Sequence, residues 1–446
     1  MLSHVVQTRS VRTRSVETRS VESATPEPRL VIEHREALIY MICEAAELEH
    51  GLMCEYLFAA FSLKDRVDEG VTEDQLAAIR RWRSTISGVA AQEMLHLALT
   101  ANMLTALGAS PHLSRPNLPQ PARHYPASVR LALLPFGEKA LRHFLYLERP
   151  EGLALDDAEG LAAVDEALPV MGEEEIVPRG QDFATVGHLY RSIESGFGHL
   201  VEKLGADRVF IGPPQAQITQ ANFSWPQLVP ITDLASVTAA IEAIVEQGEG
   251  PRGDWRQAHF GRFKGVLDEF LALRQVDPGF EPARPVAVAT VRPGEGDPGG
   301  LLISDPVTAK VADLGNVVYE VLLQVLYRLL SRIDESDAEI ATLADVAVGL
   351  MMNCLEPLGG VLTTLPVGPD NPSATAGITF ELFYQPDYLL PHRRAAWLLI
   401  SERLAQAGAL AAHLSDTVSA LHPIAAALAQ MSDKVATDAI RVSVVE

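Results

Sequence analysis

Apolar and polar positions follow a helical period along most of this chain. Apolar residues recur every three or four positions from about Arg35 to Lys64, and again from Thr72 to Gly108. This spacing predicts two long helices that form an α-hairpin. Thr72 is a typical N-cap for the second helix, and Gly108 is a typical stop.

The same period continues in two later segments. One predicted helix runs over residues 182–205, with Asp182 as its cap. The next begins at Thr232 or Asp233, is interrupted at 248–253 and resumes at about Trp255. Together the four segments predict an all-α fold built on a four-helix bundle. A break inside an apolar helix costs stability and often marks a site.

A long, proline-punctuated excursion separates the second and third predicted helices. It covers residues 111–178 and contains a strand-like run at 129–134 and an apolar segment at 144–147. Its length is unusual for a connection without a function of its own. We expect it to cover the bundle, cap the site and help to select the substrate.

These patterns divide the chain into four parts. Residues 1–34 contain a five-residue Val-Thr-Arg-Ser repeat and are predicted to form a disordered or peripheral arm. Residues 35–275 are predicted to form the bundle, and residues 276–306, which are rich in proline and glycine, are predicted to form a linker. Residues 307–446 are predicted to form a second helical unit that serves as a scaffold or interface.

Composition narrows the functional classes. The 446 residues carry a formal net charge of −22, which disfavours nucleic acids and anionic membranes as partners. The three cysteines show no Cys-x-x-Cys spacing, so a disulfide framework or thiolate site is not expected. We find no apolar run long enough to span a bilayer without charge and no secretory leader, which predicts a cytoplasmic protein.

Candidate chemistry lies in the first two predicted helices. Glu49 and Tyr56 are seven residues apart and share a helix face, as do Glu93 and His96, which are three apart. Both pairs lie in apolar surroundings, where an unpaired charge is costly. The pattern is typical of carboxylate-bridged di-metal sites in helical bundles. Tyr56 is placed to hydrogen-bond a carboxylate on the second helix.

The later helices offer further candidates. His259 follows the predicted break within an apolar stretch, and Glu249 lies among glycines that allow the backbone to aim it inward. His188 and Glu194 on the third helix cannot both face one point, because six residues rotate them by about 120°, and we favour His188. Carboxylate and imidazole ligands suit iron first, with manganese and zinc as alternatives.

Several segments, taken in order, resemble the ferritin-like proteins grouped with iminophenyl-pyruvate dimer synthase, whose members include part of the dimer-forming enzymes of violacein and rebeccamycin biosynthesis. The similarity rests on E-L-E-H-G-L-M-C-E-Y-L-F-A-A from Glu47, A-A-Q-E-M-L-H from Ala90, F-L-Y-L-E-R-P-E from Phe144, I-V-E-Q-G-E-G from Ile244 and H-F-G-R-F from His259, and continues in segments from Glu356, Ala376 and Pro391.

The resemblance implies a ferritin-like bundle with metal ligands at Glu49, Glu93, His96, Glu249 and His259. This chain departs from the usual pattern in two places. It has His188 where Glu is more usual, and Arg256 where an acid precedes the histidine of the last pair. A mononuclear or asymmetric site is therefore an alternative to a symmetric di-iron centre.

The resemblance also implies a function. We expect a non-haem iron oxidase or oxygenase of bacterial secondary metabolism that uses dioxygen and a small amino-acid-derived or imine substrate. Oxidative dimerisation of an imino acid is the narrower form of this hypothesis. Homo-oligomers or complexes with enzymes of the same pathway are the expected assemblies. The alternative is a metal-binding or structural ferritin-like protein without catalysis, because the fold alone does not decide function.

Overall fold

The computed structural model describes residues 30–120, 126, 129–161, 168, 172–250, 254–293 and 300–442. Within these ranges the regular structure is helical, and only isolated β-bridges occur, such as that between Leu63 and Ala283. The prediction of an all-α protein is therefore confirmed. The repeat at residues 6–23 lies outside the described part of the chain.

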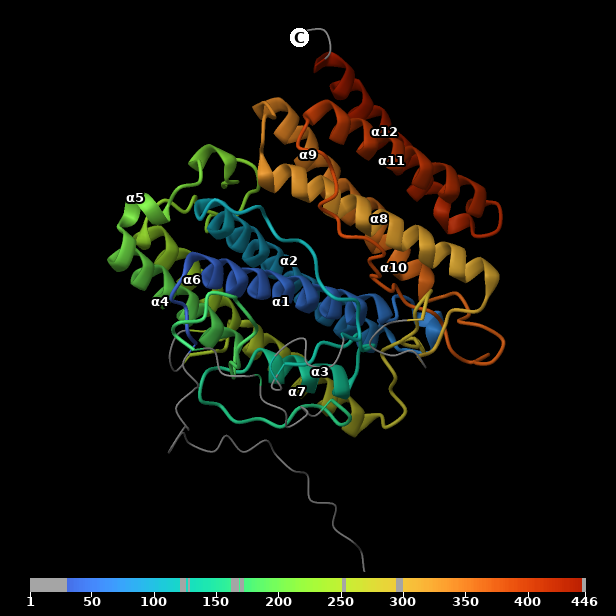
Figure 1. Cartoon of the computed structure of the whole chain (residues 1–446). Helices are drawn as coiled ribbons and strands as arrows, with labels where there is room; N and C mark the ends of the chain where they lie inside the picture. Colours follow the sequence, from blue (N-terminus) through green and yellow to red (C-terminus); the bar gives the residue numbers. More distant parts are fainter. Residues whose placement is uncertain are drawn as a thin grey trace, which may run out of the picture.

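Two long helices form the predicted hairpin. Helix α1 spans Arg35–Ser62 and α2 spans Glu73–Ala106, and they lie side by side along the middle of the molecule (Figure 1). Thr72 caps α2 by accepting the backbone N–H of Gln75, as expected for an N-cap. Gly108 follows the last turn with φ +84°, a conformation that glycine adopts without strain.

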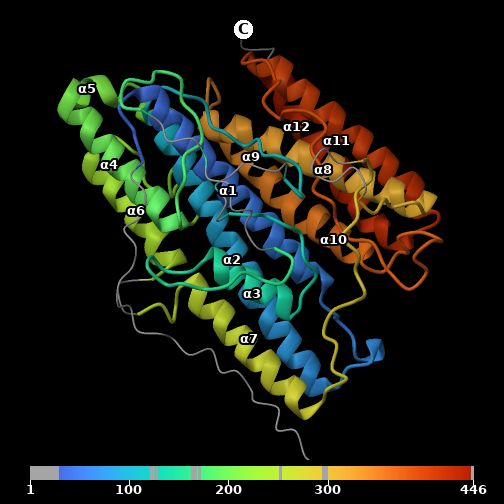
Figure 2. The same cartoon turned by 60° about the horizontal axis from the view of Figure 1, so that its bottom comes forward.

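The other two positions of the bundle are occupied by broken helices. Helices α3 (Glu138–Leu147) and α4 (Val186–Leu204) form one, and α6 (Leu234–Gly248) and α7 (His259–Val276) form the other. Helix α4 packs against α6, and α3 against α7, so the two pairs follow one another along the hairpin (Figure 2). Both breaks therefore lie near the middle of the bundle.

The first break is closed by contacts between its ends. Arg149, just after α3, donates a hydrogen bond to the carbonyl of Ala184, just before α4. The intervening excursion leaves and returns at the same level of the bundle. A short helix, α5 (Ala206–Val209), follows α4.

The strand prediction at residues 129–134 is wrong. The segment is extended but pairs with no strand, and its backbone groups bind side chains instead. The N–H of Ala132 donates to the Glu55 carboxylate, and that of Leu131 donates to Gln120 Oε1 at 3.0 Å. Side-chain acceptors here replace the partner strand, which is why the apolar alternation was misleading.

Two predicted helix starts also shift. The cap of α4 is Thr185, whose hydroxyl accepts the N–H of His188, rather than Asp182. Helix α7 starts at His259 rather than near Trp255. The second shift places His259 at a helix start, directly at the break.

The C-terminal part forms a layer over the hairpin. Its helices are α8 (Pro306–Ser331), α9 (Asp337–Leu350), α10 (Glu356–Leu362), α11 (Arg393–Ser415) and α12 (His422–Val442). A π-helical segment, Met351–Leu355, joins α9 to α10. Helix α8 packs against α2 and α10 packs against α1, while α11 and α12 form an outer hairpin (Figure 1). One continuous hydrophobic core runs through both layers.

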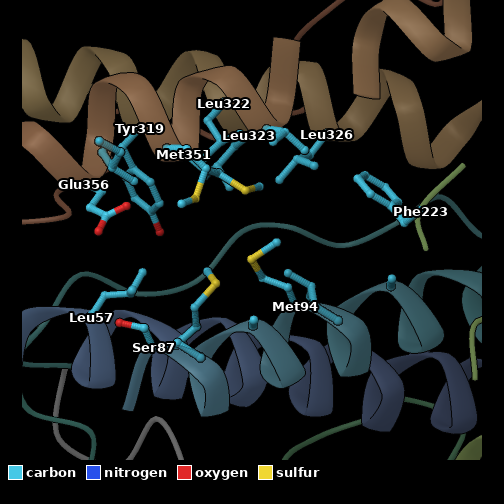
Figure 3. A pocket seen from close by; sticks show the side chains of 18 of the residues that line it. Leu57, Ser87, Met94, Phe223, Tyr319, Leu322, Leu323, Leu326, Met351 and Glu356 are labelled. Carbon is cyan, nitrogen blue, oxygen red and sulfur yellow. The ribbon is translucent and has the colours of Figure 1, made fainter. Parts of the chain in front are cut away.

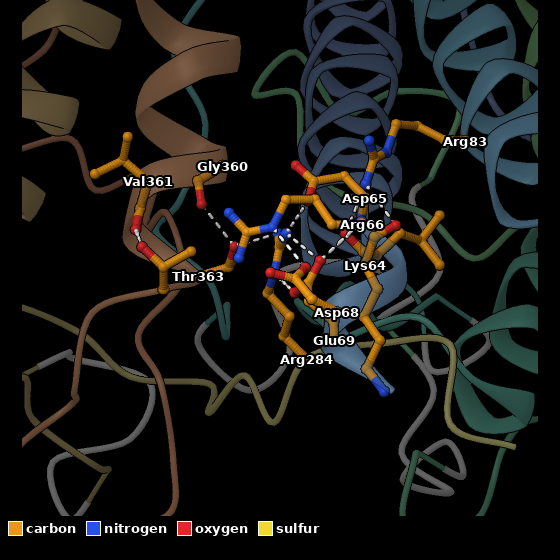
Figure 4. A network of polar contacts seen from close by, with 12 residues as sticks. Lys64, Asp65, Arg66, Asp68, Glu69, Arg83, Arg284, Gly360, Val361 and Thr363 are labelled. Atoms are coloured by element: carbon orange, nitrogen blue, oxygen red, sulfur yellow. Dashed lines mark hydrogen bonds and ion pairs between the residues drawn. The ribbon is translucent and has the colours of Figure 1, made fainter. Parts of the chain in front are cut away.

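The predicted linker is fixed to both layers through Arg284. Its guanidinium binds Glu69 at 2.6 Å and Asp65 at 2.8 Å beside the α1–α2 turn, and Thr363 Oγ1 at 3.0 Å after α10 (Figure 4). The Arg284 side chain is only 8% exposed. This segment therefore connects the two layers by specific polar contacts.

The helix Asp337–Leu362 is long and apolar enough to cross a membrane by length and composition alone. More than half of its most apolar window, 56%, is buried inside the protein, against α8 and α12. Core helices of globular proteins satisfy the same measure, so this finding is weak evidence for a membrane span. The cytoplasmic location stays a prediction.

Candidate metal centre

Three buried side chains from the hairpin form a first group of ligand atoms. Glu49 on α1 and Glu93 and His96 on α2 offer atoms that all lie within 4.8 Å of one another. His96 Nδ1 is 2.8 Å from Glu93 Oε2 and 3.3 Å from Glu49 Oε2. All three side chains are at most 3% exposed. The i, i+3 spacing predicted from the sequence brings Glu93 and His96 together as expected.

A second group combines the hairpin with the two helix breaks. It consists of Glu93, Glu148 at the C-terminal end of α3, and His259 at the start of α7. His259 Nδ1 is 3.0 Å from Glu93 Oε1 and 3.5 Å from Glu148 Oε1. The breaks in the two helices thus place one carboxylate and one imidazole opposite α2.

Glu93 belongs to both groups. Its Oε2 faces His96 and its Oε1 faces His259, and the two imidazole rings lie 5.6 Å apart at an interplanar angle of 27°. A carboxylate that presents one oxygen to each of two ligand sets has the arrangement of a bridging ligand in di-metal sites.

Tyrosine hydroxyls hold the outer carboxylates. Tyr190 on α4 donates to Glu49 Oε1 at 2.5 Å, and Tyr56 on α1 donates to Glu148 Oε1 at 2.5 Å. The prediction that Tyr56 binds a carboxylate of the second helix is wrong, because its partner comes from the α3 terminus. Hydrogen bonds of this kind fix ligand orientation.

The arrangement fits a metal. His96 Nε2 lies 3.0 Å from Gln247 Oε1, which leaves Nδ1 for the ligand group. His259 Nε2 is buried without a hydrogen-bond partner among the described residues, and Glu93 Oε1 and His259 Nδ1 contact each other at 3.0 Å without hydrogen-bond geometry. Such atoms are costly unless something else satisfies them. Three carboxylates and two imidazoles form a donor set that suits iron, manganese or zinc.

Burial and mutual charge determine the acidities of the carboxylates. Burial raises the pKa of Glu49 to about 8, although His96 opposes the shift. Burial also disfavours the charged form of Glu93, but His259 and His96 outweigh it and hold the pKa of Glu93 well below its usual range. Without metal, Glu93 therefore keeps its charge at neutral pH, whereas Glu49 is protonated.

The neighbouring carboxylates raise the pKa of both imidazoles. Burial disfavours the charged form of His259, but Glu93 and Glu148 outweigh it and raise the pKa of His259 to about 9. Glu93 and Glu49 likewise overcome burial and raise the pKa of His96 well above its usual range. Protons on these rings balance the buried carboxylates when no cation does so.

Glu249 borders the same site without joining either ligand group. Its carboxylate accepts the backbone N–H groups of Gly187 at 3.1 Å and Glu151 at 3.3 Å. A Cβ at Gly187 would lie 2.1 Å from Glu249 Oε1, so glycine permits the close approach. Burial raises the pKa of Glu249 to about 7.

The structure does not bring His188 into either group. The side of α4 that borders the site presents Gly187 and Tyr190, and His188 is rotated by about 100° from its predecessor. Its imidazole is half-buried away from the ligands, and burial lowers its pKa. Tyr190 takes the inward position that was predicted for His188.

Sequence reasoning missed Glu148 and Tyr190. Glu148 lies in F-L-Y-L-E-R-P-E, one of the segments that carry the family resemblance, but it has no helical spacing to another ligand. Arg256, the departure noted near His259, lies before α7 begins and its side chain is 84% exposed. The acids beside His259 are Glu93 and Glu148 instead.

Comparison with known proteins places this architecture in a family. The ferritin-like family matches residues 42–268, half of the chain, and the chain belongs to that family. The match covers α1 to α7 except for the first residues of α1 and the last residues of α7, and includes all five ligand-group side chains. The predicted ferritin-like fold is thereby confirmed.

Two curated relatives are enzymes by name. Dichlorochromopyrrolate synthase of Lentzea aerocolonigenes is 26% identical over 388 residues, which cover 80% of this chain and 37% of the relative. The 2-imino-3-(indol-3-yl)propanoate dimerase of Chromobacterium violaceum is 26% identical over 358 residues, covering 76% of this chain and 33% of the relative. The chain spans about a third of the length of these relatives.

A crystal structure at 1.95 Å resolution of a ferritin-like protein from Caulobacter vibrioides is also similar. Its TM-score is 0.48 and its sequence identity 19%, and the match covers 74% of this chain and 97% of that chain.

Proposed function

We propose that this chain is a metal-dependent oxidase or oxygenase that acts with dioxygen on a small amino-acid-derived imine. The observation that carries the proposal is the pair of buried ligand groups that share Glu93. The names of the two relatives, a synthase and a dimerase, support an enzymatic role, and the name of the dimerase supports an imino-acid substrate.

Glu49, Glu93, His96, Glu148 and His259 would hold the metal, for which iron is our first choice and manganese or zinc the alternatives. Iron bound there would supply the redox chemistry with dioxygen that these side chains lack.

The surrounding residues of the protein orient the ligands and exclude water. Tyr56 and Tyr190 orient the two outer carboxylates. Phe144 and Phe263, whose rings lie 4.7 Å and 4.9 Å from that of Tyr56, form an apolar wall on the side of the break. Glu249, with a pKa of about 7, is suited to accept or return a proton at the rim of the site.

Oxidative dimerisation is the narrower form of the proposal. Two imino acids would each lose one hydrogen as a carbon–carbon bond forms between them. Dioxygen would accept the two electrons and two protons and leave as hydrogen peroxide. This balance needs only the substrate and dioxygen.

A second candidate is a metal-binding protein that converts no organic substrate. The cavity beside the ligands has a volume of about 20 Å³, which is room for one water-sized molecule. Dioxygen fits such a space, whereas an imino acid requires the site to open. This one observation favours the second candidate.

Oxygen uptake distinguishes the two. The iron-loaded protein would receive 2-imino-3-(indol-3-yl)propanoate, generated in place by oxidation of tryptophan, with catalase present. The enzyme hypothesis predicts imine-dependent oxygen uptake and a product with the mass of two imines less two hydrogens. The Glu93→Ala/His96→Ala variant should lose both, and Glu194→Ala/His199→Ala, a Glu/His pair outside both ligand groups, should keep them.

Bound metal without imine-dependent uptake would support the second candidate instead. A protein that binds no metal would contradict both.

A further inference from the structure

A second, larger cavity lies between the two layers of the molecule. It has a volume of about 420 Å³ and is enclosed by α1 and α2 on one side and by α8, the π-helical segment and α10 on the other (Figure 3). Met94 and Leu97 of α2 line it, whereas Glu93 and His96 on the same helix face the ligand groups. The cavity is therefore separate from the metal centre, and its size is typical of small-molecule sites.

Its walls suit an aromatic ring. Met53, Met94, Met351 and Met352 line the cavity, and Phe223 closes the end opposite Glu356 (Figure 3). The ring of Phe223 stacks on Trp225 with centroids 4.9 Å apart. Methionine side chains adapt to irregular ligands and make favourable sulfur–aromatic contacts.

Polar groups gather at one end only. Figure 3 shows the Glu356 carboxylate, the Tyr319 hydroxyl and the Ser87 hydroxyl at the same end. The Tyr319 hydroxyl lies 2.5 Å from His50 Nε2 and accepts from Arg115 at 3.0 Å, so it is engaged within the protein. Among the described lining residues Glu356 is the acid, and none is Lys, Arg or His. This end attracts a cation and repels a carboxylate.

The helix beside this end is built irregularly. The N–H of Glu356 binds the carbonyl of Met351, five residues back, and Pro357 lacks an N–H altogether. The widened turn lets Met351, Met352 and Glu356 all line the cavity. Such π-helical turns cost regular hydrogen bonding and occur frequently at functional sites.

We propose that this cavity binds an aromatic amine, with the ring among the methionines and the ammonium group toward Glu356. The ligand differs in charge from the propanoate in the name of one relative, which the acidic end would repel. The site is therefore distinct from that of the proposed imine chemistry and goes beyond it.

Two probes with the same ring and opposite charge test this proposal. Titration calorimetry of the full chain would compare 2-(1-naphthyl)ethylamine with 1-naphthylacetate. We expect the amine to bind about tenfold more tightly, the combined effect of one attraction and one repulsion at the exposed Glu356 carboxylate. Glu356→Gln should remove most of that preference while both probes still bind.

A cavity-filling variant tests whether the amine binds inside the cavity. A Cβ at Gly88 meets no atom within 4 Å, so Gly88→Leu extends into the cavity and should abolish binding of the amine. Gly198→Leu on α4, a helical glycine with equally open surroundings, is the matched control and should bind normally. Ala91→Leu fills the same cavity from the next turn and serves as a second test.

The proposal is overturned if neither probe binds, if the acid binds as tightly as the amine, or if folded Gly88→Leu and Ala91→Leu proteins retain the parent affinity. None of these results depends on metal loading, so this proposal fails or holds independently of the proposed function.

Discussion

Glu148 and Glu49 each accept a short hydrogen bond from a tyrosine, and this contact fixes the orientation of each carboxylate. Tyr56→Phe and Tyr190→Phe keep the aromatic packing and remove only the hydroxyl. We expect metal affinity to fall about 10- to 100-fold in each variant, the usual cost of losing such a partner. Competition with a chelator measures the effect. Tyr327→Phe, in the C-terminal layer, should match the parent, and equal affinities in all four proteins would contradict the assigned roles.

Protonation of the ligands predicts how metal binding depends on pH. The pKa of His259 is about 9 and that of Glu49 about 8 in the metal-free site, so both carry protons at neutral pH. Metal must displace those protons, and its apparent affinity should therefore rise between about pH 6 and 8.5. Zinc titrations followed with a pH indicator should show proton release that shrinks toward the upper end of this range.

The stability of the metal-free protein should change in the opposite direction. The raised pKa of His259 stabilises the fold below the ordinary value of 6.5, and this contribution is lost as the pH rises through about 9. Metal-induced stabilisation should consequently grow with pH. A metal effect on the melting temperature that is constant over this range would contradict the ligand assignment.

At the residue scale, the sequence predicts only what local spacing determines. Glu93 and His96 share a helix face because they are three residues apart, and the structure brings them together. Glu148 meets His259 through packing of α3 on α7, more than a hundred residues apart in the chain, and no local period encodes that contact. His188 and Tyr190 differ by two positions on one helix, a distinction that periodicity alone did not resolve.

The start of α7 depends on a glycine. A Cβ at Gly261 would lie 2.2 Å from the carbonyl oxygen of Trp255 and 2.6 Å from that of Arg256, because the chain before the helix folds closely over its first turn. Gly261→Ala should lower the free energy of unfolding by about 1–3 kcal/mol and reduce metal content, since His259 begins the same turn. Urea unfolding and metal analysis measure the two effects.

Gly265 provides the control for this prediction. It lies one turn further along α7, where a Cβ meets no atom within 4 Å. Gly265→Ala should therefore stabilise the protein by about 0.5–1 kcal/mol through helix propensity. If both alanines behave alike, the close approach at Gly261 does not shape the break.

At the element scale, the sequence predicted the break between α6 and α7 because glycine interrupts an apolar helical pattern there. It did not predict α3, whose ten residues are surrounded by proline-rich chain. A helix this short is stabilised mainly by packing on its neighbour. Its burial against α7 is a tertiary contact that the local pattern does not contain.

The two layers of the molecule are held by Arg284 as well as by the continuous core. Arg284→Met should lower the free energy of unfolding by about 3 kcal/mol at neutral pH, because two carboxylates lose their buried partner. Burial disfavours the charge on Glu69, but Arg284 outweighs it and lowers the pKa of Glu69 to about 2. Its contribution is present above the ordinary value of 4.5 and is lost as the pH falls toward 2.

The difference in stability between parent and Arg284→Met should therefore shrink below about pH 4.5. Chemical unfolding at neutral and acidic pH tests this, with Lys64→Met as a control in the same turn. A difference that is independent of pH would show that Glu69 is not the partner that matters.

At the scale of the whole molecule, the sequence correctly indicated a bundle followed by further helices. Composition suggested that residues 276–306 only connect the two. Arg284 binds both layers, and the backbone N–H groups of Val291 and Arg292 donate to Glu381 of the C-terminal part. An arginine in a Pro/Gly-rich stretch gives no sign of partners some 80 and 215 residues away.

We propose that Glu93 serves two metal positions, and metal analysis of protein produced with iron is the sharpest test. We expect about two iron atoms per chain in the parent, about one in Glu148→Ala and none in Glu93→Ala. Glu194→Ala should keep the parent load. A Glu93→Ala protein that retains the full load, or a parent that binds none, would show that Glu93 does not hold metal.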